Sequence, residues 1–546
     1  MSRDETVSVA KTIETPEWVN SGTVLTDGLD LLGLRLPVQT IGGSLLDGVT
    51  TVTPSVRYIA FRAWLIYRYG ESHLPDSWQE FTAFSGYVEC ALVLGNLIHE
   101  RSLNGLIGAD EAIIRLDAQT TQIGISQLVK TPATTIYAGP SEQLGIAWSR
   151  DDGIPGLSAE RGKPLAITLD QALSKIPLVK RLFEQGRPSE AIRDDLAELG
   201  SVARIDQIPD AEREALIAAV LPTAPLSRER TRIGTYAALL MLAKEKSAPP
   251  TEKDLFSAAC SLRRFGDPLL DHVADGWLTY CVRDAIAVSQ EAVLGEIMKE
   301  ITAAPEYGRA GVESQQIIAE LLVRGEEHNA PLRDLGLLGA SESISDMTFR
   351  QLFARVETLL KPGLRQERGM SRWAAGLTEP NLYNLTLRSG AGALSLAVVT
   401  WIMAAIRVGT GVRENLVEFG NLSYQGWRRM GLRDVILPEI ERLNREDPPL
   451  TTVAADLAYR AVQQHLQIAW SRLQVDLRRD VALITAEGNQ WFSRGKSFGA
   501  GRTASRLREA LGWMTQLKLI DANGTTADGD QILSGALRVL SEGAIA

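Results

Sequence analysis

The sequence predicts a mainly α-helical, multidomain protein, and three observations carry that prediction. The chain has 546 residues, which at roughly 100–200 residues per domain is enough for about three to five domains. Apolar residues recur at helical spacing over long stretches, and no alternation of strands with helices indicates a doubly wound sheet. Hydrophobic residues make up 45% and charged residues 23% of the chain, as is typical of soluble globular proteins.

Individual helices are indicated by this apolar period and by signals at their ends. The clearest patterns run through residues 210–221, 230–246, 252–264, 268–301, 346–360 and 452–478. A further helix opens at Thr53-Pro54 with the sequence TPSVRYIAFRAWLIYRYG. Because that segment is apolar nearly all round, we expect it to be buried, with its arginines paired with carboxylates or extended to the surface.

Cysteine usage and the apolar segments indicate a cytoplasmic protein. The three cysteines are widely spaced in apolar helical contexts, which favours reduced, buried thiols over disulfides. The N-terminal segment MSRDETVSVAKTIETPEW has no apolar signal core. Residues 389–406, SGAGALSLAVVTWIMAAI, are uncharged, but Ser, Gly and Thr dilute their hydrophobicity, so we expect a buried central helix here and no contact with a membrane.

Changes in composition predict six segments. They are an N-terminal helical region at 1–108, a small helix-and-hairpin module at 109–170, a helical domain at 171–305, a helical segment and linker at 306–380, a helical core region at 381–455, and a C-terminal module at 456–546.

Two distant stretches follow the same local plan. Residues 143–165 read QLGIAWSRDDGIPGLSAERGKPL, and residues 516–533 read QLKLIDANGTTADGDQIL. In each, a helix ends in Gln-Leu, a strand-like step reaches a tight turn at Asp152-Gly153 or Asn523-Gly524, and a capped helix follows. This order resembles the second half of a winged helix-turn-helix domain, in which a recognition helix precedes a β-hairpin wing. The resemblance implies one or two small winged-helix-like α+β modules.

Only the C-terminal copy has the charge to bind phosphate. The chain carries a net charge of −10, yet residues 488–518 carry six cations and a single acid. Residues 503–517 form an amphipathic helix with an apolar stripe of Leu507, Ala510, Leu511, Met514 and Leu517. The equivalent helix of the earlier copy, residues 137–144, has no Lys or Arg, so there we expect contact with protein.

The polar side of this C-terminal helix and the preceding loop RGKSFGAGR are the predicted nucleic-acid interface. Arginine and lysine bind phosphates, while Ser, Gln and an exposed Trp can contact or stack on bases. We expect phosphate contacts from Arg494, Lys496, Arg502 and Arg508, and base contacts from Ser505, Arg506, Trp513 and Gln516. The alternative to a nucleic-acid interface is a solvated helix with a half-buried Trp513 and an Arg506–Glu509 pair.

No catalytic motif is readable, and we expect no metal and no cofactor. The sequence has no zinc spacing, nucleotide-binding glycine motif or nucleophile elbow. The leading hypothesis is a non-catalytic scaffold that binds nucleic acid, taken to be DNA, together with protein partners. Large helical proteins of this kind suggest a prokaryotic DNA-processing or phage-defence assembly. Alternatives are a protein-interaction subunit without nucleic acid, and a nuclease using scattered carboxylates such as Asp27, Asp30 and Asp47.

Overall fold

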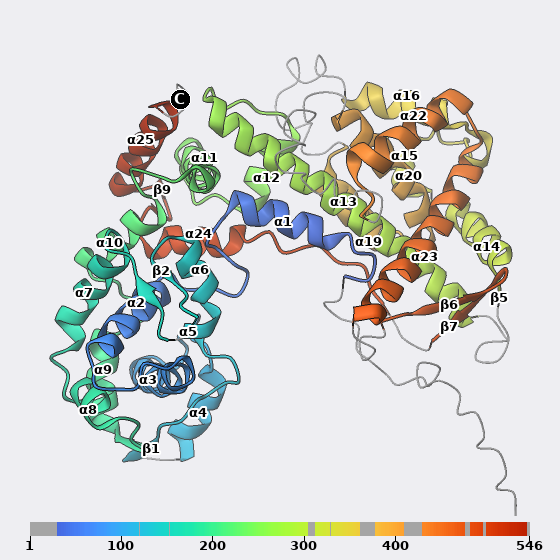
Figure 1. Cartoon of the computed structure of the whole chain (residues 1–546). Coiled ribbons are helices and arrows are strands. Elements are labelled where there is room, and N and C mark those ends of the chain that lie inside the picture. Colours follow the sequence, from blue (N-terminus) through green and yellow to red (C-terminus); the bar gives the residue numbers. More distant parts are fainter. Residues whose placement is uncertain are drawn as a thin grey trace, which may run out of the picture. The chain divides into compact units, whose positions relative to one another are not determined.

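The predicted mainly helical fold is confirmed by the structure, a computed structural model (Figure 1). It describes residues 30–118, 121–151, 153–303, 312–327, 329–360, 377–408, 429–475, 481–494 and 498–542. The chain divides into two compact units, each built from segments far apart in the sequence. Unit 1 combines the described residues up to Gln39 with 278–503, and unit 2 combines 40–277 with the described residues from Ala504 onward. Two of the three boundaries fall within helices α1 (Arg35–Leu45) and α13 (Pro268–Ala303), and the third follows Thr503.

Unit 2 is a cluster of helices with three two-stranded antiparallel sheets among its described residues. Its helices are α2 (Arg57–Gly70), α3 (Trp78–His99), α4 (Ala109–Ala118), α5 (Ala133–Ile136), α6 (Ala138–Gln143), α7 (Gly162–Leu173), α8 (Pro177–Gln185), α9 (Arg193–Val202), α10 (Asp210–Val220), α11 (Arg230–Lys246), α12 (Glu252–Cys260), α24 (Leu507–Gln516) and α25 (Ala527–Glu542). The sheets pair β1 (Gln122–Gly124) with β4 (Glu190–Ile192), β2 (Ala147–Trp148) with β3 (Gly156–Leu157), and β8 (Ile520–Asp521) with β9 (Gly524–Thr525).

Helix α2 is the centre of unit 2, and its expected burial is confirmed. It packs against α7 and α10, while α3 packs against α9 and α4, as Figure 1 shows with α3 seen along its axis. The Arg57 guanidinium is buried and binds the Glu212 carboxylate at 2.7 and 2.8 Å. Arg62, also buried, donates to the Thr134 carbonyl at 2.7 Å. The expected pairing with a carboxylate is therefore confirmed for Arg57 and wrong for Arg62, whose Nε has no hydrogen-bond partner among the described residues and whose pKa burial lowers to about 10.

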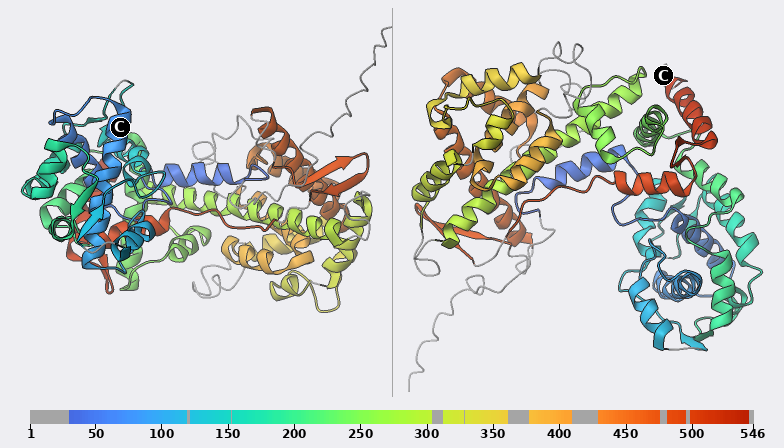
Figure 2. Two further views of the ribbon diagram at one scale, coloured as in Figure 1. Left: turned by 90° about the horizontal axis from the view of Figure 1, so that it is seen from below. Right: turned by 180° about the vertical axis from the view of Figure 1, so that it is seen from behind.

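Unit 1 is a second helical cluster with one small sheet. Its helices, besides the unit 1 part of α13, are α14 (Ser314–Glu327), α15 (Ala330–Asp334), α16 (Phe349–Leu360), α19 (Glu379–Arg388), α20 (Ala393–Arg407), α22 (Leu437–Glu446) and α23 (Leu450–Val475). Strands β5 (Val312–Glu313), β7 (Gln490–Ser493) and β6 (Ile484–Glu487) form the three-stranded antiparallel sheet (Figure 2).

The uncharged segment at 389–406 forms the core of unit 1. Helix α20 packs against α16, α19, α22 and α23, and the pair Arg407–Glu379 at its end is buried with a 2.9 Å bond. Two helices among the described residues, Trp78–His99 and Gly390–Arg407, are long and apolar enough to cross a membrane, and both are mostly buried inside the protein. The expected burial of this segment is confirmed. The three cysteines, all of them among the described residues, are buried and are not joined in disulfides.

Several predicted element bounds agree with the structure. The predicted C-terminal module, in contrast, does not form one compact unit. Helix α11 covers the predicted 230–246, and α10, α12, α13, α16 and α23 lie where the periodicity placed them. The residues of the predicted module at 456–546 are divided between the two units, with the boundary after Thr503. The six segments remain a prediction about folding units.

Candidate nucleic-acid interface

The predicted basic helix exists as α24 but begins later than the sequence indicated. It starts at Leu507, because the preceding residue Arg506 adopts a left-handed backbone with φ of +65°. The apolar stripe is confirmed: Leu507, Ala510 and Met514 are buried. The resulting helix has ten residues, Leu507–Gln516, and belongs to unit 2.

The prediction that Trp513 lies exposed for stacking on a base is wrong. Its side chain is fully buried (0% exposed), and its indole Nε1 donates a 2.8 Å hydrogen bond to the carbonyl of Thr53. The helix is covered on this side by the segment that leads into α2. Since a buried indole needs a partner for its N–H, the Thr53 carbonyl explains why Trp is tolerated at this position.

Three other residues predicted to contact bases are instead hydrogen-bonded to the backbone of unit 2 or buried in it. Gln516 donates from Nε2 to the Pro54 carbonyl at 2.9 Å and accepts at Oε1 from the Val56 N–H at 2.9 Å. Arg506 donates to the Val49 carbonyl at 2.8 Å, and Ser505 is buried. The exposed base-reading face expected on this helix is therefore not formed, because its polar side chains hydrogen-bond the backbone of residues 49–56.

The remaining predicted residues differ in their placement. Arg508 is exposed on α24 in unit 2. Arg494 and Arg502 belong to unit 1, where the exposed Arg502 guanidinium lies 4.4 Å from the centre of the Tyr383 ring. Lys496 lies outside the described residues. The predicted interface therefore does not belong to one compact unit.

The loop before α24 directs its backbone N–H groups at carboxylates of α13. Gly501 N–H donates to Glu291 at 3.3 Å, and Thr503 N–H donates to Asp284 at 3.0 Å. Burial raises the pKa of Asp284 to about 6, while the Thr503 hydrogen bonds oppose this shift. Asp284 and Glu291 therefore accept from both of these backbone groups, which makes neither available to a phosphate.

The hairpin after α24 is present, but it is short and covered. Strands β8 and β9 pair Asp521 with Gly524, so the turn is one residue earlier than the predicted Asn523-Gly524. A Cβ placed on Gly524 would lie 2.6 Å from the carbonyl oxygen of Ala243 and 3.0 Å from the amide nitrogen of Ala248. The hairpin thus packs directly against the C-terminal end of α11. The earlier copy also forms its hairpin, from β2 and β3.

A cleft of about 930 Å³ opens beside α24, entirely within unit 2. One wall is the outer edge of α24 with Arg508 and Gly512, continuing to Lys518. The facing wall is the end of α9 and the loop from α9 to α10, residues 201–209, with Asn104 and Gly105 beside it. None of the residues lining the cleft is aromatic. Sequence reasoning missed this site, because its walls are separated by some three hundred residues of chain.

Two of the charged residues on the cleft lining are cations that form no ion pair with the described residues. Arg508 and Lys518 are exposed and form no ion pair with any residue that the structure describes. Asp206 is bound by Arg204 through two hydrogen bonds of 2.8 and 2.7 Å, and these lower the pKa of its carboxyl. Burial raises the pKa of the half-buried Glu509 above its usual value. The lining therefore carries two cations and two acids, and Arg204 offsets the charge of one of these acids.

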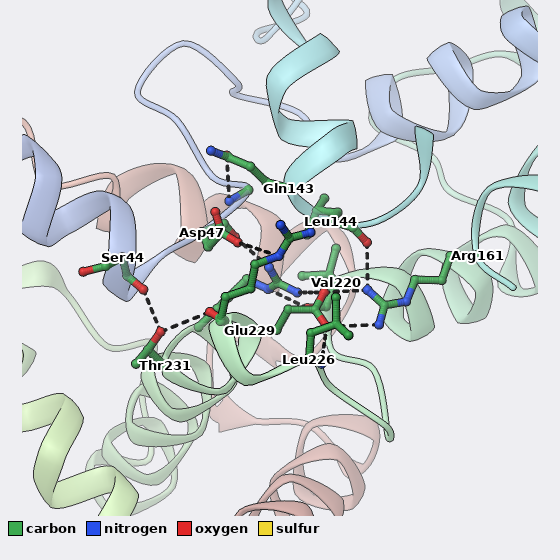
Figure 3. A network of polar contacts seen from close by, with 12 residues as sticks. Ser44, Asp47, Gln143, Leu144, Arg161, Val220, Leu226, Glu229 and Thr231 are labelled. Carbon is green, nitrogen blue, oxygen red and sulfur yellow. Dashed lines mark hydrogen bonds and ion pairs between the residues drawn. The ribbon is translucent and has the colours of Figure 1, made fainter. Parts of the chain in front are cut away.

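The carboxylates considered for a nuclease site are bound elsewhere. Asp30 accepts from the backbone N–H groups of Arg35 and Leu36 at the start of α1, at 3.1 and 3.0 Å. Asp47 lies in unit 2 beside the buried Glu229 network of Figure 3; its carboxylate forms an ion pair of 4.0 Å with Arg228, and its backbone carbonyl accepts from Arg232 at 2.8 Å. Asp27 lies outside the described residues. Within the described ranges, no group of three potential ligands is placed to hold a metal.

Figure 3 shows how Glu229 organises that network. The carboxylate is fully buried and accepts from Arg161 at 2.5 and 3.0 Å and from Arg232 at 3.1 Å. It also accepts from the Leu226 N–H at 2.8 Å. Because every strong donor here already has an acceptor, we interpret the network as structural. It joins η2 (Ser227–Glu229) to α11 and to the loop before α7.

Comparisons with known proteins gave no match: no family model, no curated protein and no solved structure is similar to this chain.

Proposed function

We propose that this protein is a non-catalytic subunit that binds nucleic acid through the cleft of unit 2, with Arg508 and Lys518 contacting phosphates. One observation carries the proposal: both exposed cations line a cleft of about 930 Å³ and have no ion-pair partner in the described part of the chain. Phosphate contacts from Arg and Lys supply most of the affinity of non-specific nucleic-acid binding. The proposal keeps Arg508 from the predicted site and adds Lys518.

The acidic total charge restricts the interface to such a local patch, because a surface that is negative on average repels the phosphate backbone. Arg494 and Arg502 of unit 1 are further phosphate contacts in this proposal, although they are separate from the cleft. The cytoplasmic location, the protein partners and the membership of a prokaryotic DNA-processing or phage-defence assembly stay predictions from the sequence.

Fluorescence anisotropy with a labelled oligonucleotide tests the proposal. Binding is expected to weaken as salt rises from about 50 to 200 mM. The double variant Arg508→Glu/Lys518→Glu is expected to weaken binding by at least about tenfold at low salt. A matched control is Lys175→Glu/Lys180→Glu, which makes the same change in net charge at two exposed lysines of unit 2 that do not line the cleft. Equal loss in both variants would rule out the cleft as the binding site.

A second candidate is a protein-interaction subunit without nucleic acid. The observation favouring it is that Trp513, Gln516 and Arg506 all hydrogen-bond the backbone of residues 49–56, so α24 acts as a packing helix. Absence of binding to any oligonucleotide at low salt would select this candidate.

A further inference from the structure

We propose that the cleft accepts a single strand of nucleic acid and that the protein does not read a duplex with its helix and hairpin. This inference rests on the proposed function, because it names the form of nucleic acid that the same cleft binds.

The first element, the helix, cannot enter a major groove. Groove readers project one exposed helical face whose side chains reach base edges. In α24 the face opposite the apolar stripe, with Arg508, Gly512 and Thr515, forms one wall of the cleft and lies across from residues 201–209. That opposing wall keeps this helical face from projecting into a groove, and the neighbouring Trp513 is fully buried.

The second element, the hairpin, cannot enter a minor groove. Each of its strands has two residues, and Gly524 touches the end of α11 so closely that a single added carbon would clash with the Ala243 carbonyl. The residues that follow are tied to the same surface, since Thr526 donates from its hydroxyl to the Lys518 carbonyl and Lys244 pairs with Asp530 at 3.0 Å. The hairpin is a packing element of unit 2.

The site that remains for an anionic ligand is the concave cleft. The cleft volume of about 930 Å³ lies within the range of about 300–1,000 Å³ that is usual for pockets holding small organic ligands. A duplex presents a convex surface with two backbones and stacked bases inside, whereas a single strand can bend into a recess and bring its phosphates to one wall. Polar groups of Asn104, Ser201 and Gln207 on the lining offer hydrogen bonds to sugars and bases.

Arg508 lies in the first turn of α24, and Lys518 lies two residues beyond its last residue, Gln516. Both line the cleft, so a strand that contacts both must extend along this wall. Affinity should therefore rise with oligonucleotide length until both cations are engaged. None of the residues lining the cleft is aromatic, so binding should depend on phosphate contacts and fall steeply as salt rises.

Gly512 provides a charge-neutral test of cleft occupancy. It lies in α24 on the cleft lining, and a Cβ there would meet only the Pro54 carbonyl oxygen, at 4.0 Å. The variant Gly512→Leu should fill the cleft without disturbing the helix, since glycine is the poorer helix former. The matched control is Gly535→Leu in α25, where an added Cβ meets nothing within 4 Å and which does not line the cleft.

The experiment compares single-stranded DNA, single-stranded RNA and duplex DNA of one sequence by anisotropy at low salt. The expected result is that a single strand binds at least about tenfold more tightly than the duplex, that Gly512→Leu removes this binding, and that Gly535→Leu keeps it. The DNA and RNA arms identify which strand is preferred. Melting curves of both variants confirm folding.

Two outcomes would overturn the inference, and they differ in what they say about the proposed function. If the duplex binds as tightly as the single strand and Arg508→Glu/Lys518→Glu still weakens it, the single-strand inference fails while nucleic-acid binding stands. If single strands bind equally well to Gly512→Leu, the strand does not occupy the cleft. If no oligonucleotide binds, the proposed function fails, and the inference fails with it.

Discussion

The indole nitrogen of Trp513 donates a 2.8 Å hydrogen bond to the carbonyl of Thr53, a residue 460 positions earlier in the chain. This bond fixes the orientation of α24 in unit 2. It turns toward the interior the side of α24 that carries Trp513. The proposed function follows from this orientation of α24, because Arg508 and Lys518 stay at the surface and line a cleft. They do not project from a protruding helix.

Trp513 should therefore matter for stability and not for binding. Trp513→Ala removes a fully buried aromatic side chain, and we expect a loss of about 3–5 kcal/mol in the free energy of unfolding. Trp513→Phe keeps most of the volume but leaves the Thr53 carbonyl without its donor, at a cost of about 1–3 kcal/mol. Urea denaturation measures both. A phenylalanine variant with full stability but no oligonucleotide binding would show that the indole contacts the ligand.

The covered hairpin is tested at Gly524. Its φ of +103° and its contact with the Ala243 carbonyl both oppose a side chain, so Gly524→Ala should destabilise the protein by more than about 2 kcal/mol. The comparison is Gly488→Ala in the β6–β7 hairpin, where φ is +59° and nothing lies within 4 Å of an added Cβ. There only about 1 kcal/mol of backbone strain is expected. Equal melting temperatures of the two variants would contradict the packing of β8–β9 on α11.

Glu509 should oppose the ligand, since it is the acid on the cleft lining that no cation in the described residues pairs with. Glu509→Gln is expected to strengthen oligonucleotide binding by about threefold to tenfold. Burial raises the pKa of this carboxyl, so protonation on acidification removes its charge and binding should tighten as pH falls. The variant should lack this part of the pH dependence. An unchanged pH profile in Glu509→Gln would refute the assignment.

Glu89 gives unit 2 a pH-dependent stability that is independent of the ligand. Its buried carboxylate accepts from the Ala133 and Thr134 N–H groups at 2.8 and 3.2 Å, yet burial dominates and raises its pKa to about 7. A carboxyl with a raised folded pKa contributes stability below its unfolded value near 4.5, and that contribution is lost as pH rises toward 7. The free energy of unfolding should fall by on the order of 1–3 kcal/mol across this range. Glu89→Gln should flatten the curve, and a wild-type protein that becomes more stable over the same interval would contradict the shift.

The sequence predicted the part of the fold that depends on local periodicity. The stripe of Leu507, Ala510 and Met514 is buried because a helical period of 3.6 places these residues on one face. The same wheel assigned Trp513 and Gln516 to solvent, because a wheel identifies one packing face and α24 packs on two sides. The second partner is the segment at 49–56, and nothing near α24 in the sequence indicates it.

The candidate site was predictable only in its charges. The excess of cations at 488–518 pointed to Arg508, which is exposed, and it included Lys518 without assigning it a role. The facing wall, residues 201–209, has no motif and acquires its role only through the packing of α9 on α3 and of α10 on α2 and α7. Composition can locate a basic segment, but a concave site requires the fold.

Photo-crosslinking tests the central claim most directly. A single-stranded oligonucleotide carrying thiouridine would be irradiated with the full-length protein, and the modified peptides would be identified by mass spectrometry. The account predicts crosslinks in the two walls of the cleft, residues 201–209 and 508–518, and their loss in Gly512→Leu. Crosslinks confined to other parts of the chain, unchanged by that substitution, would contradict it.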